Sequence, residues 1–362
     1  MKRILITGAG GSPSTNFVRS LREAPEPFQL IGVDCNRYYL QRAETDERYL
    51  VPETGDPDYI PILRSIIEET GAQFLYSQPD QEILKISGHR DELGTRTFLP
   101  DHKTIEICQD KFMSFRKWKE AGIKVPETMR VDEERDLERA FEQFGSPVWL
   151  RAIVSPGGGR GSFRAESLRV ARAWLDFCEG WGNFTAAECL RPDSVTWASI
   201  WNRGELIVAQ GRKRLYWELG NRAPSGVTGI TGTGVTVSDP AVDDIALRVV
   251  AAVDGRPHGI FAVDLTYDRD GIPNPTEINI GRFFTTHLFF TRAGLNMPYL
   301  LVKLAFGEPL PALPRKINPL SPGLAWIRGI DFLPVLSDVA RIEQPINELE
   351  TRRRRLASLS RR

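Results

Sequence analysis

The segment Phe261–Arg282 carries three oxygen-bearing side chains at spacings that could bind a metal ion. Asp264 lies about as far before the turn at 268–271 as Glu277 lies after it, so an antiparallel hairpin would bring them opposite each other. Glu277 and Asn279 are two residues apart and share one strand face. Two carboxylates and an amide oxygen suit Mg²⁺, which also binds nucleotide phosphates. We therefore expect a metal site here; the alternative is a strand face that turns its charges into solvent.

A glycine-rich segment, SPGGGRGS at 155–162, directly follows an apolar run that predicts a strand at 148–153. Such a loop exposes backbone N–H groups that can close on phosphates. It lacks the Gly-Lys-Ser/Thr ending of a Walker A motif. Arg151 lies on the strand that leads into the loop, where a guanidinium could pair with phosphate oxygens. A flexible hairpin loop and a solvent-facing arginine are the alternatives.

Other segments carry weaker signals. Lys111 stands on a helix expected at 104–121 and alone is typical of a surface lysine. The strand end 187–190 could offer backbone N–H and C=O groups to adenine, although it also fits an ordinary strand end. Arg212 and Arg214 alternate along a strand, and a solvated charged face is the default interpretation.

The acceptor site could involve a second Gly/Thr loop at 225–234 together with Arg222. Arginines and tryptophans from neighbouring segments could also line it, and packing explains the tryptophans equally well: Arg212, Arg214, Trp197, Trp201 and Trp217.

Composition limits the class of protein. The 362 residues suggest two or three sub-domains, and equal numbers of basic and acidic residues, 47 each, argue against nucleic acid or an anionic membrane as a partner. No apolar run approaches the roughly 18 residues of a membrane span. The four cysteines form no CxxC pair, which indicates reduced thiols in the cytoplasm.

The elements that must position these residues follow from periodicity. Strands at 3–7, 30–33 and 74–76 alternate with helices that begin at Ser12 and at 61, which predicts a doubly wound α/β sheet over about the first 100 residues. The following part is rich in strands and predicts a mixed, largely antiparallel α+β sheet. Its expected strands are 148–153, 184–190, 195–201, 206–217 and the hairpin 260–267/275–279, and its expected helices are 132–144, 166–179 and 239–253.

The order of these motifs resembles the ATP-grasp superfamily. Asp-Lys-x-x-x-Phe at 110–115 is followed by Val-Pro-Glu-Thr at 125–128, the strand with its arginine, the glycine-rich loop, a strand ending in Glu, and Asp…Glu-x-Asn. Within the superfamily the sequence is most similar to one synthetase half of the carbamoyl-phosphate synthase large subunit, over about residues 1–305. It has one synthetase unit and no visible glutamine-amidotransferase segment, so carbamoyl-phosphate synthesis itself is not expected.

The resemblance implies three parts: a Rossmann-like pre-ATP-grasp domain at 1–105, an ATP-grasp domain at 106–310 with a lid at about 124–186, and a C-terminal extension at 311–362. It implies an ATP-dependent carboxylate–amine or carboxylate–thiol ligase that forms an acyl phosphate and releases ADP and phosphate. ATP and Mg²⁺, with Mn²⁺ as a substitute, would be bound, the substrates would be a small carboxylate and an amine, and a homodimer is compatible with the family.

The resemblance also implies roles for individual residues. Lys111 and Arg151 would hold the ATP phosphates, and Arg282 would meet the γ-phosphate or the acyl phosphate. The other binding residues would be the lid glycines Gly157, Gly158, Gly159 and Gly161, the adenine-binding residues Glu188 and Leu190, and the metal ligands Asp264, Glu277 and Asn279. Two departures stand out: Ile280 replaces the usual Pro after Asn279, and Asp193 is the nearest acid for the ribose.

Two alternatives remain open. The turn at 8–14 nearly matches a dinucleotide fingerprint, and Asp34 lies where a ribose-binding acid would stand, which favours an NAD(P)-dependent reductase or epimerase. The last glycine of that fingerprint is replaced by Pro13 or Ser14. The departures noted above also allow a nucleotide-binding regulator without catalysis.

Overall fold

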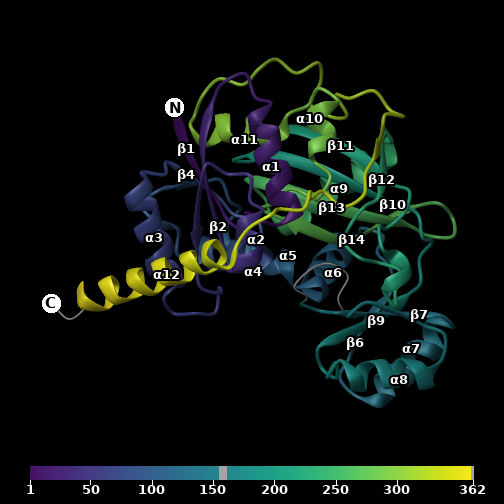
Figure 1. Ribbon diagram of the computed structural model, residues 1–362. Coiled ribbons are helices and arrows are strands. Elements are labelled where there is room, and N and C mark those ends of the chain that lie inside the picture. The colour runs from purple at the N-terminus through teal and green to yellow at the C-terminus, as the bar shows by residue number, and fades with distance from the viewer. Residues whose placement is uncertain (155–160, 360–362) are drawn as a thin grey trace. The chain divides into compact units, whose positions relative to one another are not determined.

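The chain forms two compact units in a computed structural model that describes residues 1–154 and 161–359 (Figure 1). The first unit comprises Met1–His102, Gly281–Leu313 and Ile330–Arg362, and the second comprises Lys103–Ile280 and Pro314–Gly329. Each unit is assembled from separate pieces of the sequence, whereas the predicted domains are continuous segments that follow one another along the chain.

The first unit is built on a parallel five-stranded sheet in the order β3-β2-β1-β4-β5. The buried run Ile4–Ile6 lies on its central strand, as expected for a parallel strand covered on both faces. The doubly wound domain predicted from the alternating pattern is therefore confirmed. Its strands are β1 (Lys2–Ile6), β2 (Phe28–Asp34), β3 (Glu47–Leu50), β4 (Phe74–Tyr76) and β5 (Arg96–Thr97), and its helices are α1 (Ser12–Arg22), α2 (Arg37–Gln41), α3 (Tyr59–Thr70), α4 (Asp80–Gly88) and the 3₁₀ turn η1 (Arg90–Glu92).

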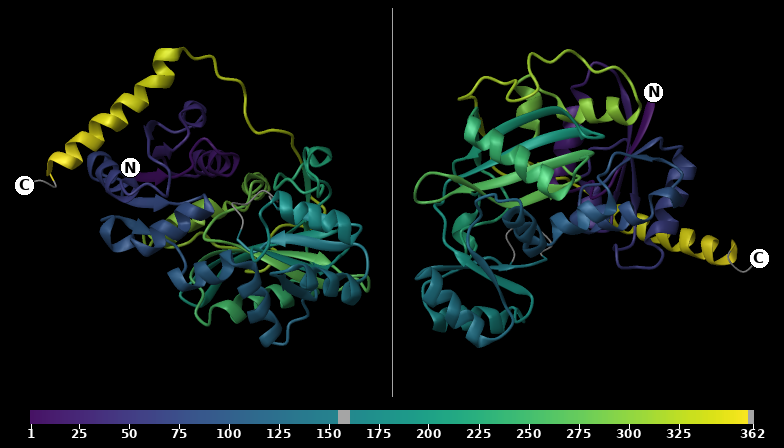
Figure 2. Two further views of the ribbon diagram at one scale, coloured as in Figure 1. Left: turned by 90° about the horizontal axis from the view of Figure 1, so that it is seen from below. Right: turned by 180° about the vertical axis from the view of Figure 1, so that it is seen from behind.

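Later parts of the chain complete this unit. Helices α10 (Leu288–Arg292) and α11 (Met297–Ala305) pack against α1. The long C-terminal helix α12 (Val339–Leu359) lies against α2, α3 and β3 (Figures 1 and 2). Among the helices of the described residues, none combines the length and apolar character needed to cross a membrane.

The second unit contains an antiparallel six-stranded sheet in the order β14-β13-β10-β11-β12-β15. Helix α9 (Pro240–Val253) covers one face through contacts with β10, β13 and β14, and the indole Nε1 of Trp197 donates to Asp243 of this helix at 2.9 Å. A polar site can therefore form only on the opposite face of this sheet, which α9 does not cover. The strands are β10 (Ser194–Asn202), β11 (Glu205–Arg214), β12 (Thr233–Val237), β13 (Gly259–Tyr267), β14 (Pro273–Ile280) and β15 (Ala325–Ile327), and the 3₁₀ turn η2 (Gly220–Arg222) lies between β11 and β12.

A smaller antiparallel sheet, in the order β6-β9-β7-β8, forms the part of the second unit that corresponds to the expected lid. Its core contains Val131, Leu150 and Leu175, all fully buried. The amphipathic helices supply the other side of this core. The elements are β6 (Thr128–Val131), β7 (Val148–Ala152), β8 (Phe163–Ala165), β9 (Phe184–Glu188), α7 (Glu134–Phe144) and α8 (Leu168–Phe177).

The single helix expected at 104–121 is wrong, because the chain forms two helices there, α5 (His102–Gln109) and α6 (Lys111–Glu120). Asp110 between them has an extended backbone, and its side chain accepts a hydrogen bond from the backbone N–H of Met113 at 2.8 Å. Aspartate at this position satisfies an amide that the helix itself leaves unpaired. The break places Lys111 in the first turn of a new helix.

Candidate active site

A row of polar residues crosses five strands of the six-stranded sheet. Residues paired across an antiparallel sheet point to the same face, and the registers pair Arg212 with Thr236 and with Thr196, Thr196 with Asp264, and Asp264 with Glu277. We call Thr236, Arg212, Thr196, Asp264 and Glu277 the polar row. The pairing of Asp264 with Glu277 confirms the hairpin geometry predicted from their spacing.

Asp264 is held at both carboxylate oxygens. Its Oδ1 accepts a hydrogen bond from the hydroxyl of Thr196, which in turn accepts one from Nη2 of Arg212 at 2.6 Å. Its Oδ2 accepts one from the amide nitrogen of Asn279 at 3.1 Å. The predicted metal residues therefore lie together, and Thr196 and Arg212 fix the position of the carboxylate.

The carboxylate of Glu277 forms an ion pair with Arg151, which comes from β7 of the small sheet. Nη1 of Arg151 also donates to the backbone carbonyl of Thr276 at 2.8 Å. Burial raises the pKa of Asp264; Arg214 opposes this effect and the nearby Glu277 adds to it. A carboxylate whose pKa is raised by a second carboxylate beside it marks a place where a bound cation would be favourable.

The donor chemistry at this place fits Mg²⁺. Among the described residues, no three His, Cys, Asp or Glu side chains are grouped to hold a metal ion, so a third side-chain ligand beside Asp264 and Glu277 would be a neutral oxygen, as in an amide or a hydroxyl group. The amide of Asn279 lies within hydrogen-bonding distance of Asp264 and can supply that oxygen. An all-oxygen set of this kind is typical of Mg²⁺.

The solvated charged face expected for Arg212 and Arg214 is wrong. Arg212 is 1% exposed, and Arg214 is only partly exposed. Burial and the neighbouring Arg214 lower the pKa of Arg212 to about 9, against the opposing effect of Asp264. Alternation along β11 correctly placed both on one face, but that face points toward Asp264 rather than toward solvent.

Lys111 lies next to the base of the glycine-rich loop. Its backbone N–H donates to the carbonyl of Ile153, the residue that follows β7, at 3.1 Å. Gly157, Gly158 and Gly159 lie outside the described residues. Gly161 has φ +77°, and a Cβ there would lie 3.0 Å from the Cβ of Ala152, so the loop ends in a turn that requires glycine.

The expected adenine and ribose residues lie at the end of β9 and just after it: Glu188 is its last residue, and Leu190 and Asp193 follow. The backbone N–H of Glu188 donates to the carbonyl of Glu127 at 3.0 Å, so adenine would have to use the carbonyl of Glu188 and the N–H of Leu190. Asp193 is paired with Lys213 at 3.1 Å and with Arg191 at 2.9 Å. These pairs, led by Lys213, lower the pKa of Asp193. A ribose would therefore compete with two cations for this carboxylate.

Arg282 belongs to the first unit and forms a two-pronged ion pair with Asp80, with Nε–Oδ1 at 2.5 Å and Nη2–Oδ2 at 3.0 Å. Gly281, which precedes it, has φ +73°, and a Cβ there would lie 3.1 Å from the side chain of Ile83. This turn accounts for the glycine, since other residues rarely adopt it. The partner Asp80 was not anticipated from the sequence.

In the first unit, the space beside the glycine-rich turn at 8–14 is occupied by neighbouring residues of the protein itself. A Cβ on Gly10 would lie 2.0 Å from the carbonyl oxygen of Tyr39, and Nε of Arg42 donates to the carbonyl of Gly10 at 2.7 Å. Both oxygens of Asp34 accept backbone N–H groups, from Gly10 and Asn36. These contacts occupy the position that a dinucleotide pyrophosphate and ribose would need, which argues against the reductase alternative.

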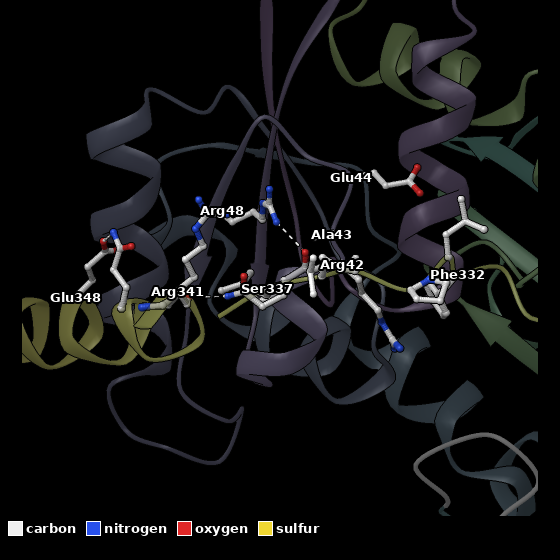
Figure 3. A pocket seen from close by; sticks show the side chains of 16 residues that line it. Arg42, Ala43, Glu44, Arg48, Phe332, Ser337, Arg341 and Glu348 are labelled. Atoms are coloured by element: carbon white, nitrogen blue, oxygen red, sulfur yellow. Dashed lines mark hydrogen bonds between the residues drawn. The ribbon is translucent and has the colours of Figure 1, made fainter. Parts of the chain in front are cut away.

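A separate pocket of about 630 Å³ lies within the first unit, between residues 40–48 and the segment 332–348 (Figure 3). Arg48 donates to the carbonyl of Gln41 at 2.8 Å, and Arg341 lies at the start of α12. None of the residues predicted to bind ATP or metal lines this pocket. The pocket lies where the C-terminal segment packs against the N-terminal part of the first unit.

Sequence reasoning missed Thr196 and Arg328, and it gave Thr231 no role of its own, although the loop singled out at 225–234 contains it. Thr231 is 2% exposed, and its hydroxyl accepts hydrogen bonds from Arg212 and Arg214, each at 3.0 Å. Its carbonyl accepts one from Arg328 at 3.0 Å. The only sequence signal for Thr196 was the alternation of small polar residues with apolar ones on the strand at 195–201. The sequence does not indicate which neighbouring strand each hydroxyl group contacts.

Comparisons with known proteins agree with this architecture. Residues 4–97 match the family model described as the PylC-like N-terminal domain. The biotin carboxylase domain of Hydrogenobacter thermophilus 2-oxoglutarate carboxylase, solved with MgADP, ADP and bicarbonate, is 15% identical, with a TM-score of 0.68 over 90% of this chain and 73% of that one.

Two other solved structures are similar to the same extent. N5-carboxyaminoimidazole synthetase from Staphylococcus aureus is 15% identical, with a TM-score of 0.63 over 86% of this chain and 78% of that one. The L-amino acid ligase from Bacillus licheniformis is 13% identical, with a TM-score of 0.64 over 84% of this chain and 74% of that one. The superfamily resemblance is thereby confirmed at the level of the fold, while the narrower likeness to carbamoyl-phosphate synthase stays a prediction. The chain has the ATP-grasp fold, and its residues 4–97 are similar to the PylC-like N-terminal domain.

Proposed function

We propose that this chain uses ATP to activate a small carboxylate as an acyl phosphate and joins it to an amine or a thiol, releasing ADP and phosphate. The observation that carries the proposal is the pairing of Asp264 with Glu277 across β13 and β14, with Asn279 bonded to Asp264. The solved structures with ADP, MgADP and bicarbonate, and the one that is an amino acid ligase, share the fold and support it.

The chemistry needs an ATP phosphoryl group because a carboxylate has no adequate leaving group. Phosphorylation supplies one, and the incoming amine then displaces phosphate. The protein's contribution is to position the reactants and to balance charge. Mg²⁺, or Mn²⁺ in its place, held by Asp264, Glu277 and Asn279 would neutralise phosphate charge when bound.

Arg151 has a role that depends on Glu277. Its guanidinium is paired with that carboxylate, and a cation at Glu277 would compete for the same oxygens. Arg151 would then be available to bind the phosphates together with Lys111, whose backbone is fixed beside the loop. Glu188 and Leu190 would offer backbone groups to adenine, Asp193 would contact the ribose, and Arg282 would exchange Asp80 for a phosphate oxygen.

The four cysteines support a cytoplasmic setting for this reaction. All of them lie in the described part of the chain, and all are free thiols. A reducing compartment keeps them in that state.

The test is acid-dependent ADP release across a matrix of small acids and amines with Mg²⁺. We expect release with at least one pair, and we expect Glu277→Gln to reduce it at least 100-fold, because the amide removes one negative charge from the metal site. The matched control is Glu205→Gln, which alters an exposed glutamate on β11 paired with Lys316. Full activity of Glu277→Gln, or equal losses in both variants, would remove the metal assignment.

A further inference from the structure

Arg212, a member of the polar row, and Arg214 lie on the same face of β11 but differ in what balances their charge. Arg212 reaches the carboxylate of Asp264 through a single hydroxyl, that of Thr196. Arg214 lies one register step further along the strand, opposite Ser194. Its Nη1 donates to the hydroxyl of Ser194 at 2.6 Å, and its Nε donates to the hydroxyl of Thr231 at 3.0 Å.

Both hydrogen-bond partners of Arg214 are neutral. The ring of Trp217 lies over the guanidinium, with its centroid 3.5 Å from Cζ. Burial lowers the pKa of Arg214, and Asp264 and Glu277 oppose this only from a distance. Within residues 1–154 and 161–359, no carboxylate is hydrogen-bonded to this guanidinium.

A guanidinium that is hydrogen-bonded only to hydroxyl groups can still bind an anion directly. Hydroxyl groups satisfy its donors, and an aromatic face adds a modest cation–π contribution, but neither neutralises its charge. Moving a charged group out of water is unfavourable unless an opposite charge meets it. Arg214 keeps a partly exposed side chain, as does Trp217, so a small ligand can reach them.

The position of Arg214 sets the size of that ligand. β11 is separated from β13 by β10 alone, and Arg214 is two residues further along than the polar row. With strands about 4.8 Å apart and a rise of about 3.4 Å per residue, its Cα lies about 12 Å from that of Asp264. The side chains shorten this gap to the length of a small molecule with a charged group at each end.

We propose that the acid substrate is a dicarboxylate: one carboxylate is activated beside Asp264 and Glu277, and Arg214 beneath Trp217 binds the other. The choice of which carboxylate reacts rests on the proposed ligase function. Thr231 acts as a positioning residue, because its one hydroxyl orients both arginines. Recognition by Arg214 would exclude the matching monocarboxylate, which leaves the guanidinium without its anion.

Binding is tested without turnover by isothermal titration in the presence of Mg²⁺ and a non-hydrolysable ATP analogue. The probes are the straight-chain dicarboxylates from malonate to adipate, each paired with the monocarboxylate of equal carbon number. We expect at least one dicarboxylate to bind at least tenfold more tightly than its partner. Arg214→Gln should abolish that preference by weakening the dicarboxylate alone, and Arg214→Lys should weaken it without abolishing it.

The matched control is Lys316→Gln, which removes an exposed positive charge paired with Glu205 at the other end of β11 and should leave the preference unchanged. The inference is overturned if no dicarboxylate is preferred, if none binds, or if the preference survives in Arg214→Gln. Should that variant fail to fold, unchanged selectivity in Arg214→Lys overturns it as well.

The ligase proposal can fail separately. Arg214-dependent dicarboxylate binding with no ADP release for any amine would retain the binding site and refute the ligase function. ADP release with monocarboxylates that is equal in wild type and Arg214→Gln would retain the ligase function and refute the dicarboxylate site.

Discussion

The hydroxyl of Thr196 joins the buried guanidinium of Arg212 to the carboxylate of Asp264. Thr196 is 2% exposed, so the bridge lies in a region of low dielectric where each hydrogen bond to a charged group counts for more than in water. A single methyl-for-hydroxyl exchange at this residue would therefore act on both charges at once.

Thr196→Val should destabilise the protein by about 1–3 kcal/mol, because it leaves charged partners without their hydrogen bonds at almost constant volume. It should also raise the Mg²⁺ concentration for half-maximal ADP release several-fold, since Asp264 loses an anchor. Chemical denaturation and a metal titration measure the two effects.

Ser199→Ala provides the comparison. Ser199 is a buried hydroxyl on the same strand that donates to the carbonyl of Phe261 at 2.9 Å, on the face covered by α9. Its loss should lower stability but leave the metal dependence unchanged. A shift of the metal dependence in both variants would show that the effect is a general loosening of β10.

Glu82 is a second buried acidic residue, and it lies on α4, the helix that carries Asp80. It is 4% exposed, and burial raises its pKa to about 7, against the lowering effect of a hydrogen bond with Thr7. The folded protein therefore keeps a proton that the unfolded chain releases above about pH 4.5. Stability should fall as the pH rises from about 4.5 through 7.

A shift of about two and a half pKa units implies that the wild type loses roughly 3 kcal/mol of unfolding free energy between pH 4.5 and pH 8. We expect Glu82→Gln not to show this loss, because the amide does not titrate. Urea unfolding at several pH values measures it. Glu68→Gln, an exposed change on α3 at a residue paired with Arg64, should keep the slope of the wild type. An unchanged slope in Glu82→Gln would place the titration elsewhere.

Residue types and spacing alone could identify the proposed metal ligands, but not the residues that hold those ligands in position. Asp264, Glu277 and Asn279 belong to one hairpin, and a hairpin's register follows from its own turn. Thr196 meets Asp264 across 68 residues of sequence, so its role depends on which strands become neighbours. The burial of Arg212 depends on that same strand pairing. Alternation along the strand therefore predicted which face Arg212 lies on, but not that this face is buried.

At the scale of elements, periodicity predicted most helices and strands because each buries an apolar face. It failed at Asp110, where a polar side chain caps a new helix inside a stretch whose amphipathic pattern continues. It could not reveal that α12 packs on the N-terminal sheet, since its apolar positions indicate burial but not against which partner.

Leu349 is the one side chain of α12 that is buried among its described residues, at 9% exposed. Leu349→Ala should cost about 2–3 kcal/mol through lost burial and a residual cavity. Hydrogen exchange should speed up in α2, α3 and β3, and not in the small sheet. Leu359→Ala, at 65% exposure, should change stability by less than about 0.5 kcal/mol.

Ion pairs hold the same helix at its C-terminal end. Arg352 pairs with Glu69 at 2.6 Å, and Arg353 pairs with Asp56 and Asp58 of the first unit. Partly exposed pairs of this kind contribute about 0–1 kcal/mol each and weaken with salt. If Leu349→Ala left exchange in β3 unaltered, these pairs rather than apolar packing would be the dominant attachment of α12.

At the scale of the whole molecule, both compact units are discontinuous in sequence, and the first contains the two ends of the described chain. The sequence could indicate two fold classes in succession, a parallel one and an antiparallel one, because local patterns report on local structure. It could not indicate that residues 281–313 return to the first unit, because that depends on packing between α1, α10 and α11.

This interleaving has a consequence for synthesis on the ribosome. The strands β1–β5 are synthesised before α10, α11 and α12, yet they need these helices to complete their unit. All strands of the second unit except β15 are already available by residue 280. Between these two units, the one whose sheet is synthesised earlier is thus the one completed later, and its uncovered apolar surfaces are the ones that chaperones would meet during that interval.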